Sequence, residues 1–110
     1  MRAHSDPQVQ VVSEAEIRRL FNTLRYWERV QNGELRAEVI RESHVTSLTH
    51  TEHCSMSQTL RYYGHDGTKI AIVHQYRRRD GTIGASGHPD PKWLRVGDIV
   101  YVPQPPASSP

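Results

Sequence analysis

Residues 13–33 carry one apolar stripe at helical spacing, and this stripe limits the possible folds more than any other feature of the chain. Ser13 and Glu16 have the spacing of a capping box at its start, and Gly33 can take the left-handed conformation that ends a helix. We therefore expect one long helix that buries its stripe against another element. The stripe recurs every three or four residues and consists of Ile17, Leu20, Phe21, Leu24, Trp27 and Val30.

After this helix, the apolar residues recur with the period of two that is typical of strands. Residues 34–42 alternate in this way. Residues 59–63 and 68–78 flank an Asp-Gly step, which predicts a hairpin. Residues 93–102 surround a Gly-Asp step, which predicts a further tight turn between two short strands.

These elements predict an α+β fold in which one N-terminal amphipathic helix packs on an antiparallel sheet of three to five strands. The helix covers one face of the sheet, and the other face stays open. Along residues 68–78 the even positions are the more apolar, so we expect them to meet the helix. Arg61 is then expected beside Gln75 and Arg77 on the exposed face. The even set is Ile70, Ile72, His74 and Tyr76.

The length of 110 residues is that of one ordinary domain. We expect a flexible N-terminal arm over residues 1–12, a single α+β domain over 13–102, and a disordered Pro- and Ser-rich tail over 103–110. No apolar run reaches the roughly 20 residues of a membrane-spanning helix, and the N-terminus lacks the apolar core of a secretory signal. These features predict a cytoplasmic protein with no membrane partner.

Positive charge is concentrated in the second half of the chain. Residues 1–54 hold seven Lys and Arg against eight Asp and Glu, whereas residues 55–110 hold seven against four. Twelve of the fourteen basic residues are Arg, whose planar fork suits bidentate contacts with phosphate or carboxylate. The charge distribution therefore permits a nucleic-acid partner without requiring one.

Seven histidines raise the question of metal binding. His44, His50, His53 and Cys54 lie close together in the sequence, and imidazole and thiolate are zinc ligands. Structural zinc sites usually pair two short ligand clusters, and no second cluster occurs here. We therefore expect no cofactor, and a metal site at these four residues stays open as an alternative.

Residues 80–92, DGTIGASGHPDPK, combine three glycines with several polar side chains. Backbone N–H groups in such a loop can form a concave nest for an anion, and nearby cations can neutralise the anion's charge. The loop lacks the Gly-Lys-Ser/Thr step of a phosphate-binding P-loop, so a Gly- and Pro-rich connector is the alternative interpretation. The candidate anion-binding residues are Gly84, Gly87, His88, Lys92 and Arg78.

Catalysis without a metal needs a base, an acid and a cation near the reacting group. The chain has such groups on residues that we expect in or near the sheet. His74 also lies among apolar positions, so a structural core histidine is the alternative interpretation of that residue. The candidate catalytic residues are His74, Arg61, Arg77 and Ser86.

The order of a helix followed by antiparallel strands over residues 13–102 resembles that of small ribonuclease toxins of the barnase, EndoU, colicin and RelE group. The resemblance covers element order only, and the chain carries no diagnostic motif of any one member. It implies an RNA substrate and cleavage on an open sheet face.

Two functions from different classes follow. The first is a small RNA-binding protein, extending to a metal-independent ribonuclease of toxin type that acts through an open basic sheet face. The alternative is a non-catalytic accessory, inhibitor or antitoxin-type module that binds another protein through a strand edge or the Pro-rich tail. Whether the chain is an enzyme and which oligomer it forms stay open at this point.

Overall fold

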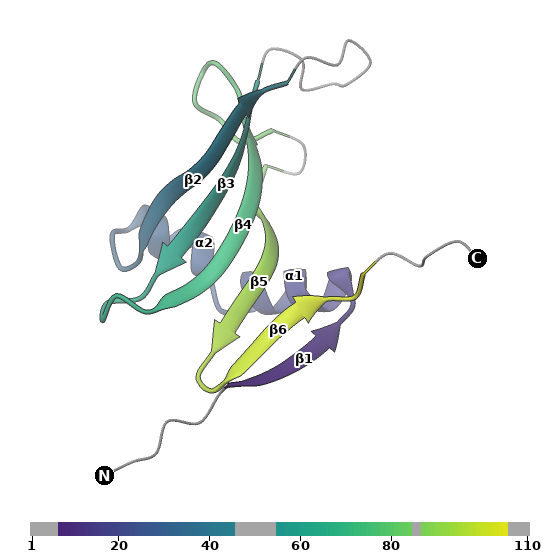
Figure 1. Ribbon diagram of the computed structural model, residues 1–110. Helices are drawn as coiled ribbons and strands as arrows, with labels where there is room; N and C mark the ends of the chain where they lie inside the picture. The colour runs from purple at the N-terminus through teal and green to yellow at the C-terminus, as the bar shows by residue number, and fades with distance from the viewer. Residues whose placement is uncertain (1–6, 46–54, 85–86, 106–110) are drawn as a thin grey trace, which may run out of the picture.

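A computed structural model describes residues 7–45, 55–84 and 87–105. A six-stranded sheet in the order β1-β6-β5-β4-β3-β2 carries two helices on one side (Figure 1). β1 runs parallel to β6, and the other neighbouring strands are antiparallel. The elements are β1 (Gln8–Val12), α1 (Glu14–Thr23), α2 (Tyr26–Gln31), β2 (Arg36–His44), β3 (Met56–Tyr63), β4 (Lys69–Arg77), β5 (Asp90–Val96) and β6 (Ile99–Pro103).

The fold class expected from the sequence is wrong in three respects. The sheet has six strands rather than three to five, it is mixed rather than antiparallel, and the helical region forms two helices. The strand that makes the sheet mixed is β1, which lies in the segment expected to be a flexible arm. β1 is only five residues long and consists of glutamine and valine. It joins the sheet by pairing with β6, which is far away in the sequence.

Arg25 divides the expected single helix in two. α1 ends at Thr23 and is capped by Leu24, and Arg25 takes a left-handed conformation with a φ of 58° before α2 begins at Tyr26. The change of direction buries Tyr26, whose hydroxyl donates a hydrogen bond to the carbonyl oxygen of Arg95 at 3.1 Å. Neither Gly nor Pro marks this break, so spacing alone predicts a continuous helix. All of the apolar stripe still packs in or against the core.

The ends of the helical region agree with the sequence. Ser13 Oγ accepts a hydrogen bond from the backbone N–H of Glu16 at 3.0 Å, and Gly33 has a φ of 87°. The Glu16 carboxylate binds the guanidinium of Arg19, with distances of 2.6 and 2.9 Å. In the part of the chain that the structure describes, no helix is both long enough and apolar enough to span a membrane.

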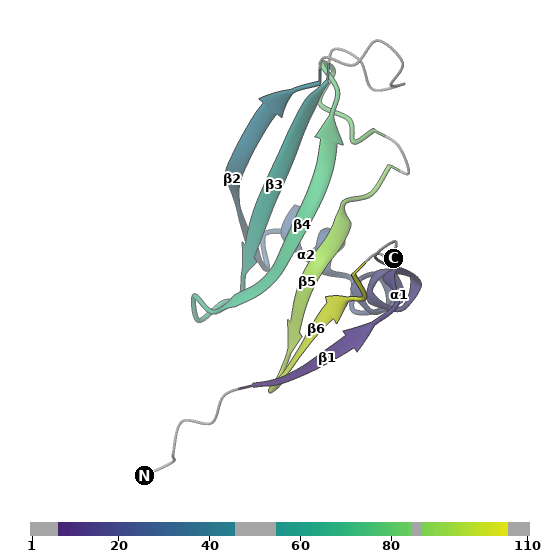
Figure 2. The ribbon, with the colours of Figure 1, turned by 45° about the vertical axis from the view of Figure 1, so that its right-hand side comes forward.

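The core lies between the two helices and one face of the sheet, which we call the helix face (Figure 2). The odd residues Ala71 and Val73 of β4 are fully buried there, so the prediction that the even positions meet the helices is wrong for Ile72, His74 and Tyr76, whereas Ile70, at a bulge, packs against the core. Small side chains on β4 leave room for the rings of Phe21, Tyr26 and Tyr62, and Phe21 lies 5.7 and 6.1 Å from the other two ring centroids. Side-chain volume, rather than apolar count, decides which face of β4 is buried.

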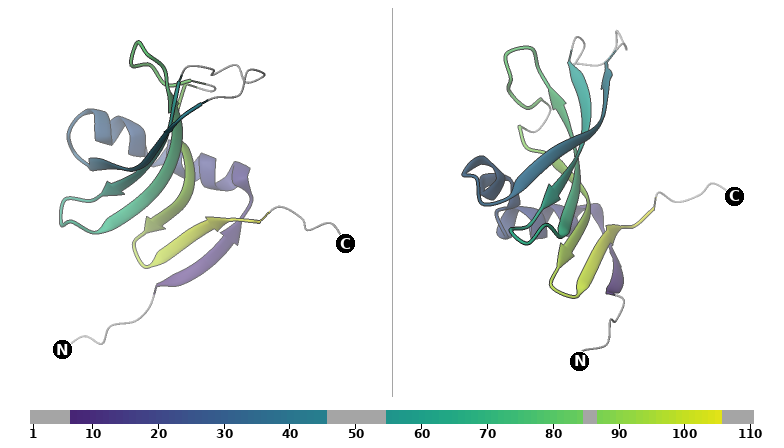
Figure 3. Two further views of the ribbon diagram at one scale, coloured as in Figure 1. Left: turned by 45° about the horizontal axis from the view of Figure 1, so that its top comes forward. Right: turned by 60° about the vertical axis from the view of Figure 1, so that its left-hand side comes forward.

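Both predicted turns form. β3 and β4 are joined by residues 64–67, where the backbone N–H of Gly64 donates to Thr68 and Gly67 has a φ of 85°. β5 and β6 meet at Gly97, with a φ of 61°. The sheet twists across its width, so its outer strands run at different angles (Figure 3). The hairpin signals in the sequence are therefore confirmed.

The left-handed residue between the helices predicts an unusual stability effect. Arg25→Gly is expected to raise the free energy of unfolding by about 1 kcal/mol, because glycine adopts a positive φ without the steric cost that arginine incurs. Ala15→Gly is the matched control, since Ala15 is exposed in the first turn of α1, where glycine should cost at most the roughly 0.5–1 kcal/mol of a helix interior. Urea denaturation measures both. Destabilisation by Arg25→Gly would instead indicate one continuous helix.

Candidate nucleic-acid interface

The side of the sheet opposite the helices is covered by no helix of the described chain (Figure 1), and we call it the open face. Its residues alternate along the strands with buried residues of the helix face, such as Leu60, Ala71 and Leu94. The pairing register then aligns them across four strands. They include Arg36, Glu38 and Arg41 on β2; Ser57, Thr59, Arg61 and Tyr63 on β3; Lys69, Ile72, His74 and Tyr76 on β4; and Asp90 and Trp93 on β5.

Cations and aromatic rings alternate across these four strands. Arg36 and Lys69 are the two register partners of Tyr63. The Arg36 guanidinium lies 4.3 Å from the centroid of the Tyr63 ring, and Lys69 Nζ lies 4.3 Å from the ring of Trp93. We call Arg36, Tyr63, Lys69 and Trp93 the cation–aromatic row. Such contacts hold the cations against the ring faces while their remaining N–H groups stay available to a ligand.

Arg61 lies next to this row. It pairs with Ile72, so it shares the open face with His74, and the expectation that it accompanies Gln75 and Arg77 is wrong. Arg61 Nη1 donates to the hydroxyl of Tyr63 at 3.2 Å. That hydroxyl donates in turn to Glu38 at 3.0 Å, whereas Arg61 Nε is buried and has no hydrogen-bond partner among the described residues. Arg61 therefore holds Tyr63 in place and keeps one donor that the described part of the chain does not use.

His74 occupies a partly buried position farther along the open face. Its Nε2 lies 2.8 Å from Ser57 Oγ, and its ring meets the ring of Tyr76 edge to face, with centroids 4.8 Å apart. Partial burial lowers the pKa of His74, and the positive charge of Lys92 lowers it further, although the negative charge of Asp90 opposes both. The imidazole is therefore neutral at physiological pH and can accept a proton.

Asp90 faces His74 across the β4–β5 pair and forms ion pairs with two side chains. Its carboxylate lies 2.9 Å from Lys92 Nζ and 3.3 Å from Arg18 Nε. Partial burial by itself would raise the pKa of Asp90, but the hydrogen bonds and charges of Lys92 and Arg18 outweigh it and lower the pKa. Asp90 is therefore an ionised bridge that holds a residue of α1 and a residue of β5 beside His74.

Gly84 and Gly87, the glycines of the predicted anion nest, use their backbone N–H groups within the chain. The N–H of the buried Gly84 donates to the Tyr76 carbonyl at 2.6 Å, and the N–H of Gly87 donates to Gly84 at 3.1 Å. Both amides are thus engaged within the chain. The ring of His88 packs edge to face on Trp27, with centroids 4.8 Å apart. Ser86, a predicted catalytic residue, lies outside the described residues.

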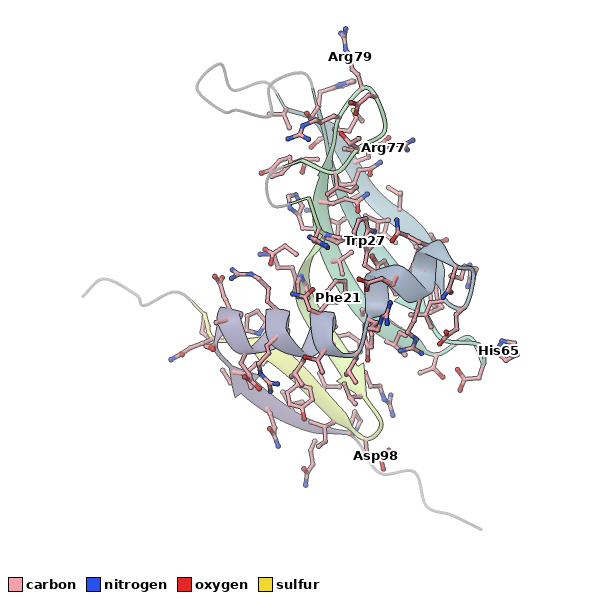
Figure 4. All side chains as sticks on the ribbon, turned by 180° about the vertical axis from the view of Figure 1, so that it is seen from behind. Phe21, Trp27, His65, Arg77, Arg79 and Asp98 are labelled. Carbon is pink, nitrogen blue, oxygen red and sulfur yellow. The ribbon has the colours of Figure 1, made fainter. Side chains whose placement is uncertain are left out.

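The three consecutive arginines do not join the open face as a group. Arg77 pairs with Met56 on the helix face, beyond Gln75 and Gln58, whose side chains are hydrogen-bonded at 2.8 Å. Arg78 belongs to the following turn, where its N–H donates to Thr82 at 2.9 Å. Figure 4 shows Arg77 and Arg79 at the end of the sheet far from Asp98. The structure therefore separates Arg77 and Arg78 from Arg61 and His74.

The described residues contain no group of three or more His, Cys, Asp or Glu placed to hold a metal ion. Of the four candidate ligands named from the sequence, only His44, at the end of β2, is described. His50, His53 and Cys54 lie outside the described residues. A metal site at these four positions therefore stays an open alternative.

Several residues of the open face belong to none of the sequence motifs that predict a site. Arg36, Lys69, Trp93 and Ser57 are scattered over four strands, and only the pairing register brings them together. The available clue is the hairpin around residues 64–67, which places Lys69 beside Tyr63 once a bulge is allowed for. Comparison with family models, curated proteins and solved structures finds no match to this chain.

The surroundings of His74 predict the direction in which its pKa responds to neighbouring charges. Lys92→Ala is expected to raise the pKa, because the cation that disfavours the imidazolium is removed, and Asp90→Asn is expected to lower it. NMR titration of the histidine ring protons measures both, with His74→Gln identifying the signal. Lys69→Ala is the control and should leave the pKa unchanged. Equal values in all variants would contradict the described placement of Lys92 and Asp90.

Proposed function

We propose that this protein binds single-stranded RNA on the open face of its sheet. The observation that carries the proposal is the cation–aromatic row. Unpaired bases stack on aromatic side chains and phosphates bind cations, so a sheet face that alternates the two suits a single strand once Arg36 and Lys69 move from the ring faces to the phosphates. A duplex hides its base faces and would leave the rings without a partner.

The row offers two rings with a cation between them. Tyr63 and Trp93 lie on β3 and β5, which are separated by β4, and neighbouring strands are about 4.8 Å apart. Tyr63 pairs with Lys69 and Trp93 with Ile72, so the two residues are also offset along the strands; two bases stacked on these rings are therefore more than about 10 Å apart, and the backbone between them passes Lys69. Arg36 is placed for the next phosphate along the same line.

The charge of the open face favours the same ligand. Arg36, Arg41, Arg61 and Lys69 outnumber its two carboxylates, and one of these, that of Asp90, is already paired with Lys92 and Arg18. A polyanion that displaces small counterions from such a surface binds with a strong salt dependence. The hydroxyls of Ser57 and Thr59 can form hydrogen bonds with a ribose 2′-OH. DNA lacks this group, so such contacts would favour RNA over DNA. We propose that the protein binds this RNA in the cytoplasm.

A second candidate function is the non-catalytic protein-binding module, and the edge strand β1 favours it. Val9 and Val11 are 63% and 60% exposed on β1, which lies at an open edge of the sheet. An exposed apolar edge can accept a strand from another protein. This candidate predicts that Val9→Lys abolishes capture of a protein partner, whereas Lys69→Ala leaves the capture intact.

Fluorescence anisotropy with a labelled RNA 12-mer tests the RNA proposal at low salt. Trp93→Ala is expected to weaken binding about tenfold, because a stacked base contributes about 1–3 kcal/mol, and Trp93→Phe should restore most of the affinity. Lys69→Ala should weaken binding and reduce the salt slope by about one. Arg19→Ala on α1 is the matched control and should change neither.

Three results would reject the RNA proposal. The first is no binding of the wild-type protein at low salt. The second is equal affinity of wild type and Trp93→Ala, when circular dichroism shows that the variant is folded. The third is an Arg19→Ala effect as large as that of Lys69→Ala, because it would mean that overall charge, rather than the open face, attracts the RNA.

A further inference from the structure

β4 and β5 separate along their length, and we call the place where they part the β4–β5 fork. The two strands pair only between Ala71 and His74 on β4. Beyond that point β4 pairs instead with the loop that connects it to β5. The contacts are a hydrogen bond from the Gly84 N–H to the Tyr76 carbonyl and a bridge between Arg77 and Ile83. The fork leaves a cavity of about 400 Å³, whose lining includes Arg18, His74, Tyr76, His88 and Asp90.

Two histidines thus line the same cavity. His74 is held by Ser57 and Tyr76 at the end of the β4–β5 pairing. His88 comes from the loop, where its ring rests on Trp27 of α2 and its conformation is restricted by the proline that follows. A pair of imidazoles at one cavity is a standard arrangement for moving a proton off one oxygen and onto another.

The cavity also has a cation that can bind a phosphate. Arg18 lines it directly and contacts both Asp90 and Glu14, and Lys92, which is not among the lining residues, contacts the same Asp90 carboxylate. These cations keep N–H groups beyond the ones that contact Asp90, since a guanidinium has five and an ammonium has three. A phosphodiester that enters the fork next to His74 can therefore be held by donors that are already in place.

We propose that the β4–β5 fork cleaves the RNA that the open face binds, without a metal ion. This inference rests on the proposed function, because its substrate is the same single strand. His74 takes the proton of a ribose 2′-OH, and the 2′-oxygen bonds to the adjacent phosphorus while the P–O5′ bond breaks. His88 gives a proton to the departing 5′-oxygen. Arg18 binds the non-bridging oxygens as their negative charge grows.

The products balance the reaction without a further reactant. They are one strand that ends in a 2′,3′-cyclic phosphate and one that begins with a 5′-hydroxyl. The proton lost from the 2′-OH stays on His74, and the proton lost from His88 stays on the 5′-hydroxyl, so exchange with water restores the two histidines. DNA lacks the 2′-OH and is not a substrate for this step.

Cleavage of an RNA 12-mer in the presence of EDTA tests the inference, with mass spectrometry identifying the ends. We expect a 2′,3′-cyclic phosphate and a 5′-hydroxyl from the wild-type protein. His74→Gln and His88→Gln are each expected to reduce the rate by about 100-fold or more. His65→Gln is the matched control, because His65 lies in the exposed turn between β3 and β4, away from the fork (Figure 4), and it should cleave like wild type.

The pH profile separates a catalytic from a structural role of His74. The groups that face His74 are Ser57 on β3, Tyr76 on β4, Asp90 and Lys92 on β5, His88 of the loop before β5, which lines the same cavity, and, through Asp90, Arg18 on α1. Lys92→Ala should shift the acid limb of the rate profile toward higher pH, because loss of the cation favours the imidazolium, which cannot act as a base. An unshifted acid limb would contradict the role of His74 as the base.

A non-cleavable 2′-O-methyl RNA distinguishes failure of this inference from failure of the proposed function. His74→Gln and His88→Gln should bind it within about twofold of wild type, which also shows that both variants are folded. Binding of this RNA without cleavage of ordinary RNA would overturn the inference and leave the binding proposal intact. Absence of both activities would overturn the two together, and cleavage by His74→Gln at the wild-type rate would overturn the role given to His74.

Discussion

The packing of two short helices against Ala71, Val73 and Leu94 is the contact on which the rest of the structure depends. Side chains alternate along a strand, so the residues that enter this core decide which of their neighbours face outward. A shift of β4 by one residue would bury His74 and Tyr76 and expose Val73. The line of cations and rings on the open face is therefore a direct consequence of how the core is filled.

The sequence predicted the local elements better than their assembly. The cap at Ser13, the apolar stripe and the two hairpins depend on residues close together in the chain, and they are confirmed. The break at Arg25 and the parallel strand β1 depend on distant partners, Arg95 and β6, and no local pattern encodes them. Arg61 is expected on the exposed face and lies on the open face, but its neighbours there are Ile72 and His74 rather than Gln75 and Arg77, because side-chain volume rather than apolar count decides which face of β4 is buried.

The candidate site could be predicted only in part. His74 and the loop around His88 were recognised from their residue types, and the structure brings both residues to one cavity. Arg77 and Arg78 are also predicted from their residue types. However, Arg77 lies on the helix face, because successive residues of a strand point to opposite faces, and Arg78 lies in the turn after β4. Trp93 and Lys69 were missed because their significance comes from a contact between two strands rather than from either segment alone.

The parallel pairing of β1 with β6 joins the first described strand to the last. Gln8 aligns with Ile99, so almost the whole described chain lies in the loop that this contact closes. Closing so long a loop is entropically costly and slow compared with forming the hairpins. We expect β1 to dock after the other strands, and a growing polypeptide on the ribosome to leave Val9 and Val11 without their partner strand until β6 has emerged.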